Sequence, residues 1–144
     1  MVSDVDVKSI LNPRTWMIVA SLVALLMVGI GPMMASSEDI ASMAEDNFGD
    51  LYTNASDGDK ETIEESVKLQ AYFFGATNVA MAVFILGFAF LTEGRTRAKG
   101  AIFCGGATIL FAIYSMAGLD GGTFYSAISL PMIIAGALHL KEGE

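Results

Sequence analysis

Long apolar runs alternate with short polar segments along this chain. Four runs are long enough to cross a bilayer, and they cover residues 15–34, 69–91, 101–118 and 124–140. A helix rises about 1.5 Å per residue, so a bilayer core about 30 Å thick needs roughly 20 apolar residues. The pattern predicts an all-α integral membrane protein in which four helices form a bundle.

Composition supports a membrane protein and gives no indication of a soluble catalytic domain. Hydrophobic residues make up 53% of the 144 residues, and the mean hydropathy is +0.55, above the usual range of a soluble domain. The spans and their links use nearly all of residues 1–144, so we expect one membrane domain without a separate soluble catalytic domain. The sequence contains no catalytic motif, and we therefore expect a protein that is not an enzyme and needs no cofactor.

The first apolar run follows two basic residues, Lys8 and Arg14, as a secretory signal would. Its apolar stretch of about 20 residues is longer than a typical signal core of about 7–15. We interpret it as an uncleaved signal anchor, with Asn12 as the helix N-cap and Pro13 at the first helical position.

Basic residues predict the orientation of the spans. Six of the eight lie before the first span, in the link between the second and third, or after the fourth: Lys8, Arg14, Arg95, Arg97, Lys99 and Lys141. If all four runs cross the bilayer, these places share one side, which the positive-inside rule puts in the cytoplasm. The sequence thus predicts a multi-pass protein of the plasma membrane with both termini cytoplasmic.

The link between the first and second spans, residues 35–68, is strongly acidic. Its ten acidic residues outnumber Lys60 and Lys68 by eight, which equals the net charge of the whole chain. Three interpretations stay open: a solvated outer loop, weak capture of divalent cations, or a docking surface for a basic partner. The candidate docking residues are Asp57, Asp59, Glu61, Glu64 and Glu65.

This acidic loop is predicted to be partly helical. Ser36 and Ser37 can cap a short helix, and its apolar stripe comprises Ile40, Met43, Ala44 and Phe48. Turns are expected at residues 48–50 and 56–59. Helical spacing resumes near Lys60, so the second transmembrane helix is expected to project from the membrane over about 32 residues in all.

Polar residues inside the spans suggest two alternatives. Asn78 forms a hydrogen bond between helices, or Thr77, Asn78, Ser115 and Ser129 together line a polar pocket. The single histidine and single cysteine make no metal site, and no charged residue lies deep in a span, which argues against an ion-coupled transporter.

Small residues predict where helices approach closely. A stripe in the third run comprises Ala101, Gly105, Thr108 and Ala112, with Gly106 beside it. Gly87 and Gly136 are further expected points of contact, because small side chains let helix backbones touch in lipid.

Four segments carry a further pattern: 69–75 (Leu-Gln-Ala-Tyr-Phe-Phe-Gly), 86–88 (Leu-Gly-Phe), 95–98 (Arg-Thr-Arg-Ala) and 119–122 (Leu-Asp-Gly-Gly). Together they resemble the DoxX-like family of small membrane proteins. The resemblance implies a four-helix bundle with a long first outer loop and a short basic turn, and some members resemble subunits of quinone-linked oxidoreductases. Many members carry an arginine in the third span, where this chain has none, so no site residue is carried over.

Two functional hypotheses follow. The first is a non-catalytic membrane subunit or assembly factor of a larger membrane complex. The second is a protein that binds a small molecule or lipid, or forms a passive pathway, as a homo-oligomer. The expected partners are the lipid bilayer and either other membrane subunits or further copies of the chain, with no nucleic acid.

Overall fold

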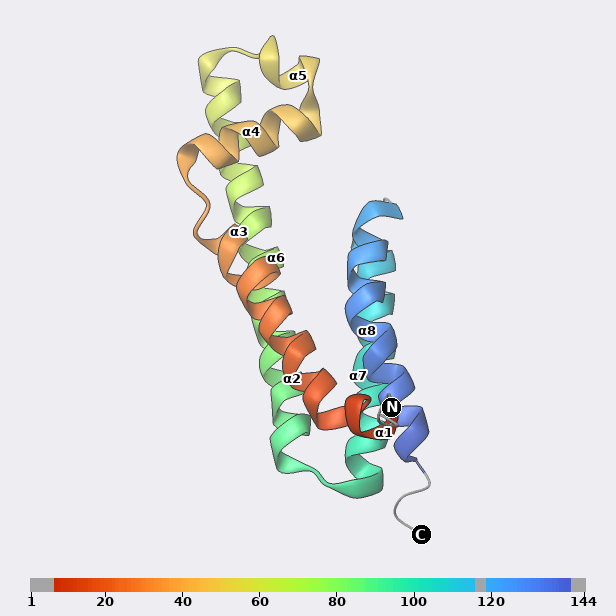
Figure 1. Ribbon diagram of the computed structural model, residues 1–144. Coiled ribbons are helices and arrows are strands. Elements are labelled where there is room, and N and C mark those ends of the chain that lie inside the picture. Colours follow the sequence, from red (N-terminus) through yellow and green to blue (C-terminus); the bar gives the residue numbers. More distant parts are fainter. Residues whose placement is uncertain (1–6, 116–118, 141–144) are drawn as a thin grey trace, which may run out of the picture. The chain divides into compact units, whose positions relative to one another are not determined.

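The computed structural model describes residues 7–115 and 119–140, and these residues form helices and short connections without strands (Figure 1). In chain order the helices are α1 (Val7–Ile10), α2 (Pro13–Val23), η1 (Ala24–Ile30, a π-helix), α3 (Gly31–Met33), α4 (Ser37–Phe48), α5 (Asp50–Thr53), α6 (Asp57–Leu91), α7 (Gly94–Ser115) and α8 (Leu119–His139). The all-α prediction is confirmed for the described part of the chain.

Within the described residues, three helical stretches are long and apolar enough to cross a membrane: Val7–Met33, Asp57–Leu91 and Gly94–Ile113. They are compatible with a multi-pass membrane protein. A fourth apolar stretch, Tyr125–His139 in α8, is shorter than a span by the same measure. The four-helix bundle and the orientation of the termini therefore stay predictions.

The start of α2 matches the sequence pattern. Asn12 precedes the helix, and its Oδ1 accepts a hydrogen bond from the backbone N–H of Arg14 at 2.9 Å. Pro13 takes the first helical position, where its missing N–H leaves no hydrogen bond unmade. The predicted N-cap is confirmed.

Contacts divide the chain into two compact units, which are described separately. Unit 1 comprises residues 1–23 and 81–144, and unit 2 comprises residues 24–80. Helix α6 contributes its C-terminal part to unit 1 and its N-terminal part to unit 2.

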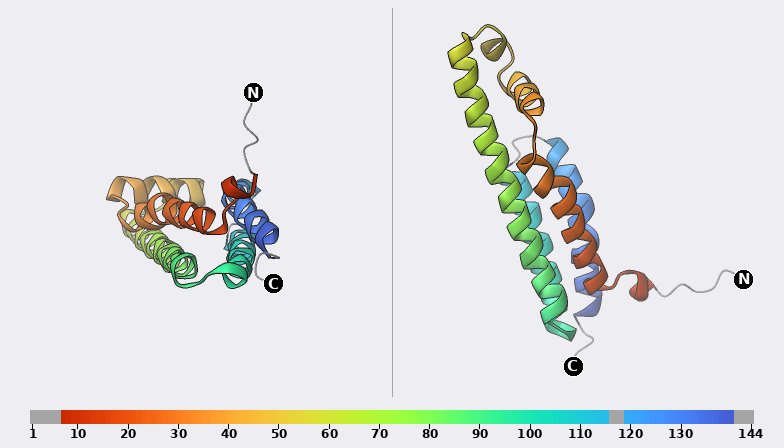
Figure 2. Two further views of the ribbon diagram at one scale, coloured as in Figure 1. Left: turned by 60° about the horizontal axis from the view of Figure 1, so that its bottom comes forward. Right: turned by 90° about the vertical axis from the view of Figure 1, so that its left-hand side faces the viewer.

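In unit 1, α7 and α8 run side by side (Figure 2). A Cβ added to Gly136 would lie 2.5 Å from the carbonyl oxygen of Ala98, and one added to Gly105 would lie 3.1 Å from that of Ser129. The two backbones therefore touch where glycine leaves room, as the stripe in the third run predicts. The unit 1 core comprises Met17, Ala20, Ile85, Ala89, Ala101, Cys104 and Met132.

Two of the predicted contact glycines are not contact points. A Cβ added to Gly87 or Gly106 meets no atom of the described chain within 4 Å. Gly106 directly follows Gly105, and one residue turns the helix by about 100°, which carries the position off the face that meets α8.

In unit 2, η1 and α3 approach α6 closely. A Cβ added to Gly75 would lie 2.5 Å from both the carbonyl oxygen of Gly29 and the Cγ of Met33. One added to Gly29 would lie 2.8 Å from the side chain of Val79. This glycine pair was not predicted from the sequence, because the two residues are too far apart along the chain to form a periodic stripe.

Beyond the apolar spans, α4 packs against the N-terminal part of α6. Ile40 and Ala44 from α4 are buried together with Val67 from α6. The predicted stripe is therefore confirmed at its centre, while Phe48 at the end of α4 is 41% exposed. The turn predicted at residues 48–50 is present at Gly49, where φ is +51°.

Two connections differ from the prediction. The segment 56–59 is not a free turn, because α6 begins at Asp57 and the Oγ of Ser56 accepts a hydrogen bond from the backbone N–H of Asp59. Helix α6 therefore spans 35 residues rather than the expected length of about 32. The basic link shortens to Thr92–Glu93, since the positive φ of Gly94 (+48°) turns the chain at once into α7. Arg95, Arg97 and Lys99 consequently belong to the first turns of α7.

Candidate amphipathic pocket in unit 2

A cavity in unit 2 has a volume of about 630 Å³ and lies between α6 and the connection from α3 to α4. Ligand pockets typically enclose about 300–1,000 Å³, so this cavity has the size of a small-molecule or lipid-headgroup site. Its lining residues are Pro32, Met33, Ala35, Ile40, Thr62, Glu65, Ser66, Lys68, Leu69 and Tyr72.

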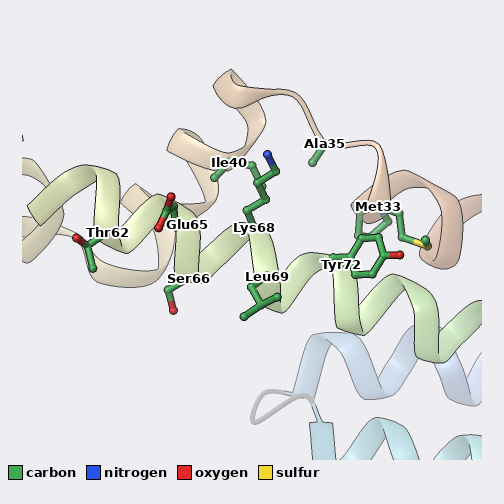
Figure 3. A pocket seen from close by; sticks show the side chains of 10 residues that line it. Met33, Ala35, Ile40, Thr62, Glu65, Ser66, Lys68, Leu69 and Tyr72 are labelled. Carbon is green, nitrogen blue, oxygen red and sulfur yellow. The ribbon is translucent and has the colours of Figure 1, made fainter. Parts of the chain in front are cut away.

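The lining changes from polar to apolar along α6. Thr62, Glu65 and Lys68 line the part toward the acidic segment, and Leu69 and Tyr72 line the part toward the apolar span. In Figure 3 the ammonium group of Lys68 extends from α6 toward the α3–α4 connection, whereas the ring of Tyr72 lies by Met33. The cavity thus offers charged hydrogen-bonding groups at one end and an apolar wall at the other.

A capping box fixes the start of α4, the helix that lines the cavity opposite α6. Ser36 and Asp39 form a capping box in which the Oδ2 of Asp39 accepts from the Ser36 backbone N–H at 2.8 Å and from its hydroxyl at 2.6 Å. The Asp39 N–H in turn donates to the Ser36 Oγ at 3.2 Å. These hydrogen bonds, the side-chain bond first, lower the pKa of Asp39 below its ordinary 3.8.

Polar contacts also join α5 to α6. The hydroxyl of Tyr52 donates a hydrogen bond to Oε1 of Glu64, and the ammonium group of Lys60 lies 5.6 Å from the centre of the Tyr52 ring. The hydrogen bond to the carboxylate raises the pKa of Tyr52, because ionisation would place two negative charges together. The short α5 is therefore fixed to the long helix by a polar contact.

A smaller cavity of about 180 Å³ adjoins the first and shares Ala35, Ile40, Glu65 and Lys68 with it. Glu61 and Glu64 complete its charged wall. Lys68 is thus the one basic residue lining either cavity among the described residues, and three carboxylates line the same region. The arrangement suits noncovalent binding of a polar or zwitterionic group.

The five candidate docking residues lie in the first turns of α6, where their environments differ. Asp57 and Glu61 are exposed. Asp59 accepts a hydrogen bond from the Ser56 hydroxyl at 2.6 Å, and Glu64 accepts from Tyr52. Glu65 lines both cavities. Two of the five therefore accept hydrogen bonds within the chain, Glu61 also lines the smaller cavity, and docking of a basic partner stays a prediction.

The predicted polar pocket of the spans remains untested as a unit. In unit 2, Thr77 donates to the carbonyl of Phe73 at 2.8 Å, and Asn78, which is fully buried, donates to that of Phe74 at 2.8 Å. These bonds lie within one helix. In unit 1, Ser129 is fully buried in α8 and its hydroxyl has no partner in the described structure. Ser115 ends α7, and its side chain lies outside the described part.

Sequence reasoning did not predict the cavity beside Lys68. The available signals were Pro32, which precedes the break at residues 34–36, and an isolated lysine where acidic and apolar sequence meet. Neither signal shows that the chain leaves a space there. Over the described residues, no group of three His, Cys, Asp or Glu side chains gathers to hold a metal ion.

No known protein family, curated protein or solved structure matches the chain. The resemblance to DoxX-like proteins stays a prediction.

Proposed function

We propose that this protein is a non-catalytic membrane protein that binds an amphipathic molecule, a lipid or a lipid-like small molecule, in the cavity between α6 and the α3–α4 connection. The observation that carries the proposal is the polar-to-apolar lining of a cavity of about 630 Å³. The change along α6 occurs where a candidate membrane span gives way to the acidic segment. An amphipathic ligand changes polarity over a similar length.

The named side chains define the expected mode of binding. The ammonium group of Lys68 donates to phosphate, carboxylate or carbonyl oxygens of the ligand head, and Thr62 offers a hydroxyl. Leu69, Met33 and the Tyr72 ring cover the first part of the apolar tail. Glu65 disfavours a head that carries only negative charge, so a zwitterionic or neutral polar head fits better.

A photoreactive lipid tests the proposal. The protein is reconstituted in bilayers that contain a phosphatidylcholine with a photoactivatable group near the head, and crosslinked peptides are identified by mass spectrometry. We expect crosslinks within residues 32–40 and 62–72. Ser66→Trp, which fills the cavity from its wall, should reduce them at least about fivefold, since ligand and indole compete for one space.

Gln70→Trp is the matched control. Gln70 is exposed on the same helix and does not line the cavity, so this variant should keep wild-type crosslinking. Labelling spread evenly along all apolar helices, or equal labelling of the wild type and Ser66→Trp, would contradict the proposal.

A second candidate function, a subunit or assembly factor of a larger complex, is favoured by a different surface. Leu51 is 75% exposed and Phe48 is 41% exposed, and both lie in the acidic segment rather than in an apolar span. Exposed apolar side chains among charges are typical of protein contact sites. Leu51→Gln should then release co-purifying subunits in mild detergent, while Thr53→Gln on the same short helix should not.

A further inference from the structure

A second, chemically different cavity lies in unit 1 at the basic end of the helices. It has a volume of about 110 Å³, and its lining residues are Asn12, Pro13, Gly94, Arg97 and His139. These residues come from the start of α2, the start of α7 and the end of α8. The volume is suited to a single small polyatomic group rather than to a drug-sized ligand.

Among the residues that line this cavity, Arg97 has a buried side-chain nitrogen without a hydrogen-bond partner in the described structure. One of its terminal nitrogens, Nη2, donates to the carbonyl oxygen of Thr92, which holds the guanidinium across the turn that enters α7. Its Nε is buried and has no acceptor within the described structure. An arginine cannot lose its charge, so a buried guanidinium N–H without an acceptor is costly and favours the arrival of an anion.

The surroundings add positive potential. Gly94 begins α7, so the cavity touches the N-terminal end of a 22-residue helix, where the backbone dipoles favour negative charge. Basic side chains are unfavourable at such an end, yet Arg95, Arg97 and Lys99 all lie in the first two turns of α7. Glu93 precedes the helix and is exposed.

His139 contributes from the end of α8. A carbonyl oxygen can only accept, so its contact of 2.9 Å with the oxygen of Ala135 assigns the hydrogen to the Nδ1 atom of the ring. This contact fixes the imidazole to its own helix at the edge of the cavity. The ring thus forms a second polar wall, on a different helix from Arg97.

We propose that this cavity binds a phosphate group, with the guanidinium of Arg97 as the principal ligand. The same chemistry is presented by the phosphodiester of an anionic membrane lipid and by free inorganic phosphate. The site is separate from the amphipathic cavity: it lies in the other unit, shares no residue with it and selects for negative charge.

The test uses the full chain purified in detergent. In one arm, phosphatidylglycerol is titrated and retained lipid is counted by native mass spectrometry, with a phosphate-free diacylglycerol as the comparison lipid. In the other arm, inorganic phosphate is titrated against chloride at constant ionic strength, and the unfolding temperature is recorded. We expect saturable binding in at least one arm, and the arm that responds identifies the source of the phosphate.

Variants localise the binding. Arg97→Gln should weaken it about tenfold or more, because it removes a charge-assisted hydrogen bond. Arg95→Gln, which removes the same charge from an exposed position two residues away, should retain wild-type affinity. If Arg97→Gln does not fold, Arg97→Lys keeps the charge but lacks the Nε donor and should weaken binding by a smaller factor.

His139→Gln offers an independent check from α8 and should also weaken binding. Absence of saturable binding in both arms would overturn the proposal. Equal losses for Arg97→Gln and Arg95→Gln would overturn it as well, because they indicate general attraction to the basic surface. Neither result bears on the crosslinks expected at the amphipathic cavity.

Discussion

Two helix contacts in this molecule are built in different ways. Between α7 and α8 the backbones touch directly, and the space for a Cβ at Gly136 is already occupied by the carbonyl oxygen of Ala98. Between α4 and α6 the contact is made by side chains, with Ile40, Ala44 and Val67 buried together. The first contact depends on the absence of a side chain, and the second depends on apolar bulk.

The difference follows the polarity of the helices. α7 includes a candidate membrane span, and apolar burial gains little where the alternative surroundings are lipid tails, so close backbone approach and dispersion must hold the helices together. The four acidic residues of α4 are all exposed, a surface suited to water, and burying Ile40 out of water is itself favourable. A helix cap at Ser36 and a hydrogen bond from Tyr52 add polar contacts in the same region.

The largest expected effect breaks the backbone contact. Gly136→Leu should lower the free energy of unfolding by about 3 kcal/mol or more, because the new side chain would separate α8 from Ala98 and Ile102. Gly106→Leu places the same side chain on the open face of α7 and should cost nothing measurable. Thermal unfolding in detergent compares the two variants. Equal stabilities would mean that close approach does not hold this helix pair.

The next effect tests the side-chain contact between α4 and α6. Ile40→Ala should destabilise α4 by about 2 kcal/mol, the low end for a buried isoleucine, because the cluster around it is small. Hydrogen exchange across residues 37–48 should accelerate accordingly, with little change in α7. Leu51→Ala, at a residue that is 75% exposed, should leave this exchange unchanged. Faster exchange throughout both units would show that the two contacts are not independent.

A smaller effect concerns the capping box. Ser36→Ala should cost about 1 kcal/mol at neutral pH, whereas Ser37→Ala should be near neutral. The capping box lowers the pKa of Asp39, so the ionised Asp39 carboxylate stabilises the folded state fully above its ordinary pKa of 3.8. This stabilisation is lost as the pH falls through the lower pKa that Asp39 has in the folded state. The difference between wild type and Ser36→Ala should therefore shrink in acid. Part of the difference remains in acid, because the Asp39 N–H still donates to the Ser36 Oγ. A difference that is as large at the lowest pH as at neutral pH would contradict this assignment.

The smallest effect compares two buried serines of unit 1. The hydroxyl of Ser21 donates to the Met17 carbonyl at 2.7 Å, while that of Ser129 has no partner in the described structure. Ser21→Ala should cost about 0.5 kcal/mol, and Ser129→Ala should be neutral or stabilising, since it removes an unsatisfied polar group. A clear loss of stability for Ser129→Ala, measured by the same thermal unfolding, would indicate that the Ser129 hydroxyl forms a stabilising hydrogen bond.

Local features of this fold were predictable, and tertiary ones were predictable only in part. The caps at Asn12 and Ser36 follow from neighbouring residues, so the sequence alone predicts them. The stripe containing Gly105 follows from the helical period, but the period does not exclude Gly106, because the difference depends on where α8 lies. Close packing of distant residues carries no local signal.

The candidate sites show the same limit. The sequence identifies polar positions inside the spans, such as Asn78, but not the partner of the side chain, whose Nδ2 donates to the carbonyl of Phe74 in its own helix. The cavity beside Lys68 is lined by α6 and by the connection from α3 to α4, two segments about 30 residues apart whose juxtaposition carries no local sequence signal. The buried Nε of Arg97 likewise depends on the turn at Gly94, which the sequence places in a longer basic link.

At Gly49 and Gly94 the backbone conformation restricts the chirality of the residue rather than its size. Both have positive φ, and both face open space, so volume does not restrict the residue there. Chirality does: an L-residue is strained in this half of backbone space, and its mirror image is not. A chain assembled by chemical ligation would therefore accept D-alanine at either position while resisting L-alanine. Two helix connections in the described chain thus depend on glycine being the one achiral residue.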